Sequence, residues 1–212
     1  NFILRRNLQG AEPSVDYGGV TSGGWGAYRV AQSQGMDWSS GSAFLAYEYH
    51  DETPLASSDR SFSEDSALKE LLPESKQNSL FADVTQAISD ALQLHADFLY
   101  AGRHNHVITG EFGPAGLQEA QTDQYQGTLG ADWSLARTWV ISSSVSLGRN
   151  STLNEAATGS NRGIASEVVG DIDANGVAFT LSTGPVRVAL GGQVRDDGFD
   201  QIPIQGLPST DR

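Results

Sequence analysis

The sequence predicts an all-β fold: an incomplete, transmembrane, antiparallel up-and-down β-barrel of about nine strands. Three observations predict it. Apolar residues alternate with small or polar ones in segments of about ten residues along most of the chain. Short and long connections take turns between these segments. Helical periodicity is almost absent.

The stretch TWVISSSVSLGRN (138–150) shows the alternation most clearly. Its two sets of side chains would point to opposite faces of a strand. One set would face lipid and the other a wet interior. The two sets are Trp139, Ile141, Val145 and Leu147 against Ser142, Ser144 and Ser146.

Eight further segments have the same pattern, and one segment predicts a helix instead. The helix is DSALKELLP (65–73), with Asp65 or Ser66 as its N-cap and Pro73 as its stop. The other expected strands lie at 11–17, 27–31, 43–50, 80–88, 92–101, 124–133, 164–172 and 186–195.

The connections and the aromatic residues indicate the two ends of a membrane barrel. Short connections are expected at 37–42, 88–92, 134–138 and 182–186, and long ones at 50–76, 104–121 and 150–161. Short periplasmic turns and longer outer loops give this order, and belts of Trp and Tyr mark the two interfaces. Trp38, Trp133 and Trp139 lie beside short turns, whereas Tyr17, Tyr28, Tyr49, Tyr100 and Tyr125 lie towards the long connections.

Composition excludes several classes of function. The 212 residues carry 13 Lys and Arg against 26 Asp and Glu, a net charge of -13 that argues against nucleic-acid binding. The chain has no cysteine, so disulfides, thiolate metal sites and cysteine catalysis are excluded. No apolar run reaches the roughly 20 residues of a membrane-spanning helix. The mean hydropathy of -0.32 is compatible with a barrel, because alternating strands average to a polar value.

Charged residues fall on the predicted interior face, where they would hydrate a lumen or pair with a plug. No Ser/His/Asp arrangement and no catalytic carboxylate pair stands out, so we expect no enzymatic activity, no cofactor and no metal site. The interior residues are Glu12, Asp16, Glu48, Asp83, Asp97, Asp132, Glu167, Asp171, Arg187 and Arg195.

The candidate substrate-binding residues are Arg103, His104 and His106, in the sequence RHNH on an expected outer loop. Imidazoles beside a guanidinium could contact an extracellular ligand. The alternative is an ordinary solvated loop. No carboxylate lies immediately beside the pair of histidines, which argues against a metal site.

The order of several stretches resembles TonB-dependent outer-membrane receptors. These stretches are NFILRRNLQGAEPSVDYGG, SGSAFLAYEYHDETPLASSDRSF, LLPESKQNSLFADVTQAISDALQLHADFLYAGR, YQGTLGADWSLARTWVISSSVSLGRN and GPVRVALGGQVR. The resemblance covers nearly the whole chain. It implies that residues 1–10 end a plug domain and that residues 11–212 form the N-terminal part of the barrel.

Such receptors import scarce nutrients, such as siderophores, cobalamin or oligosaccharides, across the Gram-negative outer membrane. The resemblance therefore implies four partners: outer-membrane lipid, an extracellular small-molecule substrate, the chain's own plug, and TonB through an N-terminal region missing here. About nine strands cannot close a barrel of the 22-stranded plugged class. We therefore interpret the sequence as a piece of a longer protein.

Two alternatives stay open. One is another outer-membrane barrel, such as a porin or an outer-membrane enzyme. The other is a soluble β-rich binding or adhesive domain. The soluble domain predicts that Leu94, Phe98, Ile141 and Leu147 are covered by protein rather than by lipid.

Overall fold

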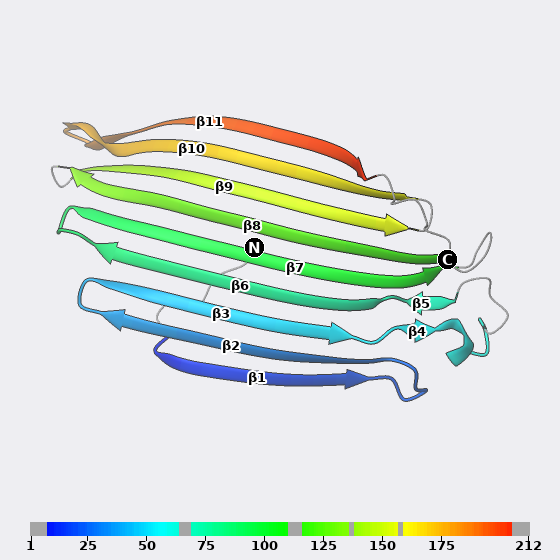
Figure 1. The fold of residues 1–212 in the computed structure, drawn as a ribbon. Coiled ribbons are helices and arrows are strands. Elements are labelled where there is room, and N and C mark those ends of the chain that lie inside the picture. Colours follow the sequence, from blue (N-terminus) through cyan, green and yellow to red (C-terminus); the bar gives the residue numbers. More distant parts are fainter. Residues whose placement is uncertain (1–7, 64–68, 110–115, 136–137, 157–158, 205–212) are drawn as a thin grey trace.

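The chain forms one large antiparallel sheet with a small two-stranded sheet beside it (Figure 1). The computed structural model describes residues 8–63, 69–109, 116–135, 138–156 and 159–204. The large sheet contains β1 (Gly10–Gly19), β2 (Gly26–Trp38), β3 (Gly41–Glu52), β6 (Glu74–Ala87), β7 (Leu92–Thr109), β8 (Gly116–Leu135), β9 (Trp139–Ala156), β10 (Gly159–Leu181) and β11 (Gly184–Ile204). The small sheet pairs β4 (Leu55–Ala56) with β5 (Glu70–Leu72), and a short 3-10 helix, η1 (Ser57–Asp59), follows β4.

The order of strands in the large sheet is the order of the chain, with β4 and β5 set aside. Each strand pairs antiparallel with the strand before it, which is the up-and-down arrangement. The prediction of nine antiparallel strands is thus confirmed. The sheet is open, and β1 and β11 lie at its two edges.

The strands are longer than the alternation predicted. They run from 10 residues in β1 to 23 in β10. The expected long connections at 104–121 and 150–161 are wrong for the most part, because β7 continues to Thr109, β8 begins at Gly116, β9 continues to Ala156 and β10 begins at Gly159. These extensions are mostly polar, and their few apolar residues, such as Val107, Ile108 and Leu153, do not alternate with a period of two. Backbone pairing holds them in the sheet regardless of side-chain polarity.

The predicted helix at 65–73 is wrong where the structure describes it. Glu70–Leu72 forms β5, in which Leu72 pairs with Leu55. The backbone carbonyl of Lys69 accepts hydrogen bonds from the Ser57 amide at 3.0 Å and the Ser57 hydroxyl at 3.1 Å. Tertiary pairing has outweighed a weak local helix propensity. Residues 65–68, with both expected N-caps, lie outside the described residues.

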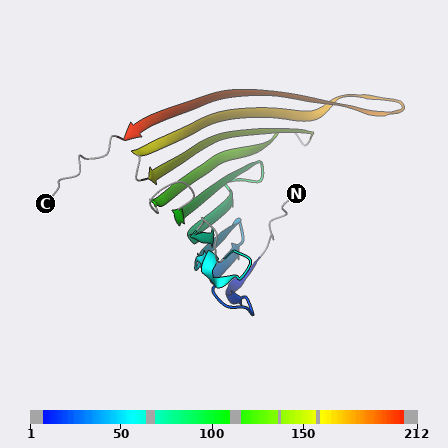
Figure 2. The ribbon, with the colours of Figure 1, turned by 90° about the vertical axis from the view of Figure 1, so that its right-hand side faces the viewer.

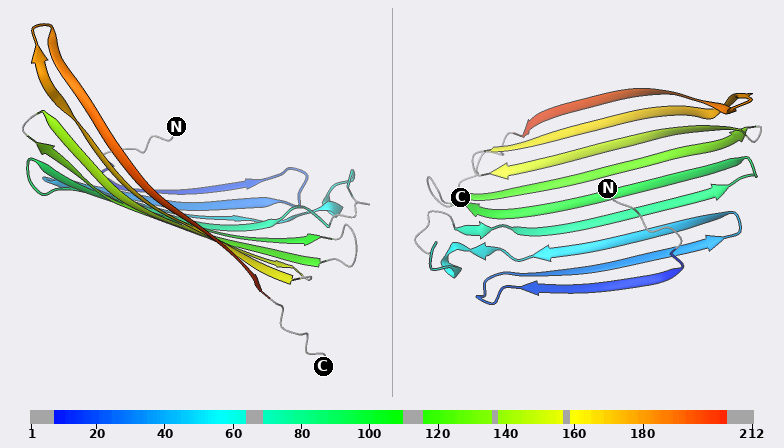
Figure 3. Two further views of the ribbon diagram at one scale, coloured as in Figure 1. Left: turned by 90° about the horizontal axis from the view of Figure 1, so that it is seen from above. Right: turned by 180° about the vertical axis from the view of Figure 1, so that it is seen from behind.

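The sheet is a single twisted and curved layer, seen along its edge in Figure 2 and from above in Figure 3. The hairpin of β10 and β11 extends past its neighbours, because residues of β10 after Val177 pair only with β11. Among the described residues, only three hydrophobic side chains are buried: Leu8, Leu55 and Val169. The sheet therefore has no hydrophobic core of its own, and its two faces determine what it can do.

Candidate functional site

The register of the strands shows which side chains share a face. Residues directly opposite each other in antiparallel strands point to the same side of the sheet. We call the face that carries Ile141, Val145 and Leu147 the apolar face, and the face that carries Ser142 and Ser144 the polar face. Opposite Val145 on the apolar face lie Leu129 in β8 and Gly170 in β10.

The apolar face contains a band without a single charged side chain. In the described strands this band covers residues 11–17 of β1, 28–38 of β2, 41–49 of β3, 80–86 of β6, 92–100 of β7, 125–135 of β8, 139–147 of β9, 168–176 of β10 and 188–194 of β11, taking every second residue. Its polar members are uncharged: Gln32, Gln34, Gln86 and Ser143. All Asp, Glu, Lys and Arg residues in the same stretches lie on the polar face.

Tyrosines border the band at one end. The rings of Tyr28 and Tyr49 lie 5.7 Å apart, and those of Tyr100 and Tyr125 lie 5.0 Å apart, measured between centroids. Tyr17 lies opposite Tyr28 on the edge strand. The tyrosines expected near the outer connections therefore share one face and follow one edge of the band.

Tryptophans border the band at the other end. The Trp38 indole donates a 2.8 Å hydrogen bond to the Gln86 side-chain oxygen, and the Trp139 indole donates one of 3.1 Å to the Val177 carbonyl. The ring of Trp139 lies over Gly176, where a Cβ would be 2.3 Å from the ring. Each ring thus presents apolar surface to the band and satisfies its polar atom at the rim, as Trp does at a boundary between apolar and wet surroundings.

The height of the band follows from the geometry of its strands. Tyr28 and Trp38 are ten residues apart on β2. At a rise of about 3.3 Å per residue this is about 33 Å of strand. In outer-membrane barrels, strands tilted by about 40° carry an apolar band roughly 25 Å tall, and a strand of this length would give the same height at that tilt.

Beyond the tyrosines the apolar face becomes polar. On this continuation of the face, Lys76 in β6 lies opposite Asp51 in β3 and His104 in β7. Lys76 also forms an ion pair with Glu74. The hydrogen bond within this pair is the main reason why the pKa of Glu74 is lowered, with smaller electrostatic contributions from His106 and His104. The uncharged band therefore ends where the tyrosines lie.

The side chains of the band are open to the surroundings in the described chain. Leu94, Phe98 and Leu147 are 37%, 40% and 56% exposed, and Ile141 is half-buried. The soluble-domain alternative predicts that protein covers these four residues. The described chain does not cover them.

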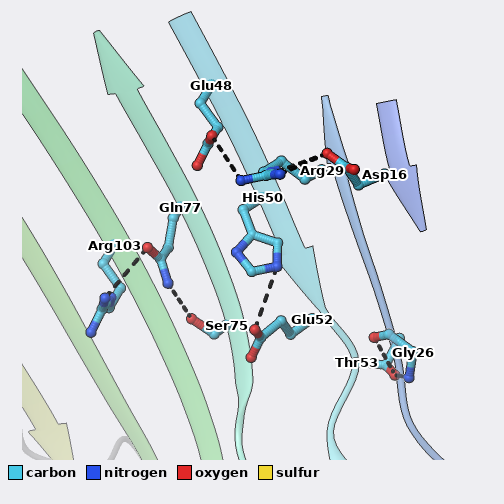
Figure 4. A network of polar contacts seen from close by, with 10 residues as sticks. All are labelled: Asp16, Gly26, Arg29, Glu48, His50, Glu52, Thr53, Ser75, Gln77 and Arg103. Carbon is cyan, nitrogen blue, oxygen red and sulfur yellow. Dashed lines mark hydrogen bonds and ion pairs between the residues drawn. The ribbon is translucent and has the colours of Figure 1, made fainter. Parts of the chain in front are cut away.

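The polar face carries the predicted interior residues, and the register confirms that all ten share this face. Several of them join ion-pair networks. Arg29 in β2 lies between Asp16 in β1 at 2.8 Å and Glu48 in β3 at 3.6 Å (Figure 4). The guanidinium therefore links three consecutive strands across the polar face.

Two further networks lie on the polar face of the later strands. The imidazole of His95 is 3.6 Å from the carboxylate of Asp132, which accepts a 2.6 Å hydrogen bond from the Ser142 hydroxyl. Arg195 contacts Glu167 at 2.7 Å and Asp197 at 2.9 Å. Carboxylates outnumber guanidinium groups on this face, so it is acidic.

The three candidate substrate-binding residues do not gather into one site. Arg103 lies on the polar face, where it donates a 3.4 Å hydrogen bond to the Gln77 side chain (Figure 4). His104 and His106 lie on the opposite face, opposite Lys76 and Glu74. All three belong to β7 and not to a loop. Their contact with a substrate stays a prediction.

The chain reaches β1 from the polar side of the sheet. Leu8 is buried against Gly35, a polar-face position where a Cβ would come within 2.1 Å of the Leu8 carbonyl oxygen. Gln9 donates a 3.2 Å hydrogen bond to Asp37 on the same face. Of the predicted plug end at 1–10, the structure describes residues 8–10 alone.

Comparison with known proteins identifies no family, because neither a family model nor a curated protein matches the chain. Within the described ranges, no helix is long and apolar enough to cross a membrane. In the same ranges, no three His, Asp or Glu side chains are placed to hold a metal ion.

The ion pairs of the polar face are the part of the site that sequence reasoning missed. Arg29 was recognised only as a member of an alternating strand. Its position between Asp16 and Glu48 depends on the registers of two strand pairs. An opposite charge at the same height on each neighbouring strand is the one signal that could have indicated it.

Proposed function

We propose that this chain is part of the wall of an outer-membrane β-barrel, with its apolar face towards lipid and its polar face towards the lumen. The single observation that carries the proposal is the uncharged band on one face of nine strands, bordered by tyrosines at one end and tryptophans at the other. A soluble protein rarely leaves such a continuous apolar surface open, because water contact with it is unfavourable. Lipid is the partner whose chemistry fits it.

The open edges support the same proposal. A sheet in lipid must close, because an unpaired N–H or C=O in hydrocarbon costs several kcal/mol. Here β1 and β11 present unpaired backbone along their outer sides. Further strands between β1 and β11 would satisfy both edges and complete a barrel larger than nine strands.

We further propose that the barrel is that of a TonB-dependent receptor, which imports a scarce nutrient across the Gram-negative outer membrane. The resemblance of the sequence is one support. A second is the approach of Leu8 and Gln9 from the polar face, since a plug that fills the lumen would join β1 from that side. The protein would then be a transporter without enzymatic activity, powered through TonB bound to its N-terminal region.

Cysteine labelling in intact outer membranes tests the orientation of the faces. These 212 residues contain no cysteine, so each variant adds a single label site within them, and the full-length protein without added cysteine serves as the background control. Cysteines at Ser142, Ser144 and Ser146 should react with a water-soluble maleimide. Cysteines at Ile141, Val145 and Leu147 should react only after detergent or denaturant is added. An alternating pattern supports the barrel wall, and uniform reactivity along 141–147 contradicts it.

Energy coupling separates the receptor from a porin-like barrel. Uptake by the full-length protein should stop when the TonB complex is deleted and should return when it is restored. A control porin in the same cells should be unaffected. Uptake that is independent of TonB would indicate a passive pore and contradict the receptor proposal. The proposal that the apolar band faces lipid would still stand.

A further inference from the structure

A groove of about 360 Å³ opens on the polar face of β8 to β11. Its volume is within the range of small-molecule sites. Residues from four consecutive strands line it, among them Gln124, Gln126, Gly148, Glu167, Arg195 and Asp197.

The groove exists because Gly148 has no side chain. Gln126 in β8, Gly148 in β9 and Glu167 in β10 lie opposite one another in one row across the sheet, and Asp197 in β11 continues the row. A Cβ at Gly148 would meet the Glu167 Cβ at 3.8 Å, which is ordinary contact. A larger residue would therefore fit the strand but fill the groove.

The charges of the groove disfavour an anionic ligand. Two arginines line the groove, but Arg149 lies opposite Tyr125 and so its side chain belongs to the apolar face. Arg195 is the lining cation on the polar face, and its guanidinium is already held by Glu167 at 2.7 Å and by Asp197 through two contacts of 2.9 Å. The three groups together carry a net charge of -1. A phosphate or carboxylate would have to displace one of the two carboxylates and be repelled by the other.

The amides of the groove suit hydroxyl groups. In the described part of the chain, the side chains of Gln124 and Gln126 make no hydrogen bond to another residue. Asn150, beside them, accepts one of 3.3 Å from Thr152. An amide offers both donors and an acceptor, which complements a hydroxyl that donates and accepts. Carboxylates that hold Arg195 keep free lone pairs for further hydroxyls.

An exposed aromatic ring lies at the rim. Phe199 is 71% exposed and lies on the polar face opposite Ala165, which lines the groove. One side of its ring lies against Gly163, where a Cβ would be 3.9 Å from the ring atoms. The other side is open. It can cover the apolar C–H face of a flat, hydroxylated ring.

From these four features we infer that the groove binds a neutral oligosaccharide. Phe199 stacks on a sugar ring at the rim, while Gln124, Gln126 and the two carboxylates bond its hydroxyls on the floor. The inference rests on the proposed function and names its substrate class. The groove lies at the level of Tyr125, the outer border of the band, and so at the outer end of the lumen.

The test is binding of neutral hexasaccharides to the full-length protein in detergent. The probes are maltohexaose, cellohexaose and xylohexaose, with hexagalacturonate as the anionic comparison. Gly148→Leu fills the groove and Phe199→Ala removes the ring. Gly170→Leu is the matched control, because Gly170 lies on the apolar face and a Cβ there would have no other atom within 4 Å.

We expect at least one neutral hexasaccharide to bind the wild-type protein. Gly148→Leu should weaken its affinity more than tenfold, and Phe199→Ala should weaken it about three- to tenfold. Gly170→Leu should bind as the wild type does. Far-UV circular dichroism of each variant checks that the sheet is retained.

Three results would overturn the inference: no binding of any neutral probe, tighter binding of hexagalacturonate, or equal loss in Gly148→Leu and Gly170→Leu. These results leave the barrel proposal standing if the labelling pattern of 141–147 alternates. A uniform labelling pattern together with intact sugar binding would contradict the barrel proposal but support sugar binding in the groove.

Discussion

At the scale of single residues, Val145 and Ser144 are neighbours in β9 that face opposite surroundings. Val145 lies near the middle of the uncharged band, and Ser144 lies on the polar face. We expect Val145→Arg to lower the free energy of unfolding in a bilayer by about 2–4 kcal/mol, the cost of a charge at the mid-depth of a barrel wall. Ser144→Arg should cost much less, because its charge reaches water.

The comparison is made by equilibrium unfolding in urea of the full-length protein in lipid vesicles. Both variants add the same side chain to the same strand. The difference between their free energies of unfolding therefore reports only the face on which the arginine lies. Equal destabilisation by the two substitutions would show that Val145 does not face lipid.

The Arg29 network makes a weaker prediction. Both of its carboxylate partners and the guanidinium are about half exposed, at 47% for Arg29 and 56% and 41% for Asp16 and Glu48. Exposed ion pairs are screened by water and contribute little. Arg29→Gln should therefore lower the free energy of unfolding by under about 1 kcal/mol. A loss of unfolding free energy above roughly twice that value would mean that water screens this ion pair less than its exposure indicates.

The residue scale also shows the limit of sequence reasoning. Alternation is a local property, so it correctly placed on one face the ten charged residues that were predicted to lie in the interior. Arg103 and His104 were expected together on a loop, but they are consecutive residues of a strand and point to opposite sides. They point to opposite sides because β7 extends through both of them, and this extension depends on pairing with β6 and β8.

At the scale of elements, the aromatic borders make a prediction about depth. A variant that keeps Trp133 and replaces the other three tryptophans by Phe should emit at short wavelength in vesicles. Lipids brominated near the headgroup should quench it more than lipids brominated near the bilayer centre, because Trp133 lies at the edge of the band. Stronger quenching by lipids brominated near the bilayer centre would show that Trp133 does not lie at the headgroup border of the band.

A second variant provides the control for depth. It keeps Trp25, which lies in the turn between β1 and β2, beyond the tyrosines. Its emission should be quenched less by either lipid than that of Trp133. Equal quenching of Trp25 and Trp133 by the lipid brominated near the headgroup would contradict the prediction that Trp25 lies outside the band and Trp133 at its edge.

The element boundaries were the least predictable part of the fold. Short turns at 88–92 and 182–186 were found because the alternation stops there. The ends of β7 to β10 beyond the tyrosines were missed because their few apolar residues do not alternate, so no period of two marks them. The segment 65–73 has helical composition, but Glu70 and Leu72 pair with β4 instead. Its partner lies 14 or more residues earlier, and a local pattern cannot show it.

At the scale of the whole molecule, the lack of a core predicts behaviour in water. Side chains such as Leu129 and Leu190 are 64% and 65% exposed on the apolar face. We expect the chain to aggregate in water and to gain strand signal in a mild detergent. Light scattering and circular dichroism with and without detergent measure this. A monodisperse monomer in water with cooperative unfolding would contradict the lipid-facing assignment.

The order of the strands in the sheet has a kinetic consequence. Every long strand pairs with its neighbours along the chain, and β4 and β5 are set aside in one connection. Loop closure costs little entropy when the partners are close in sequence, and such pairings form early. The sheet can therefore grow hairpin by hairpin in the order of synthesis. Each completed strand is the template for the next, so the last strand added always presents the growing edge.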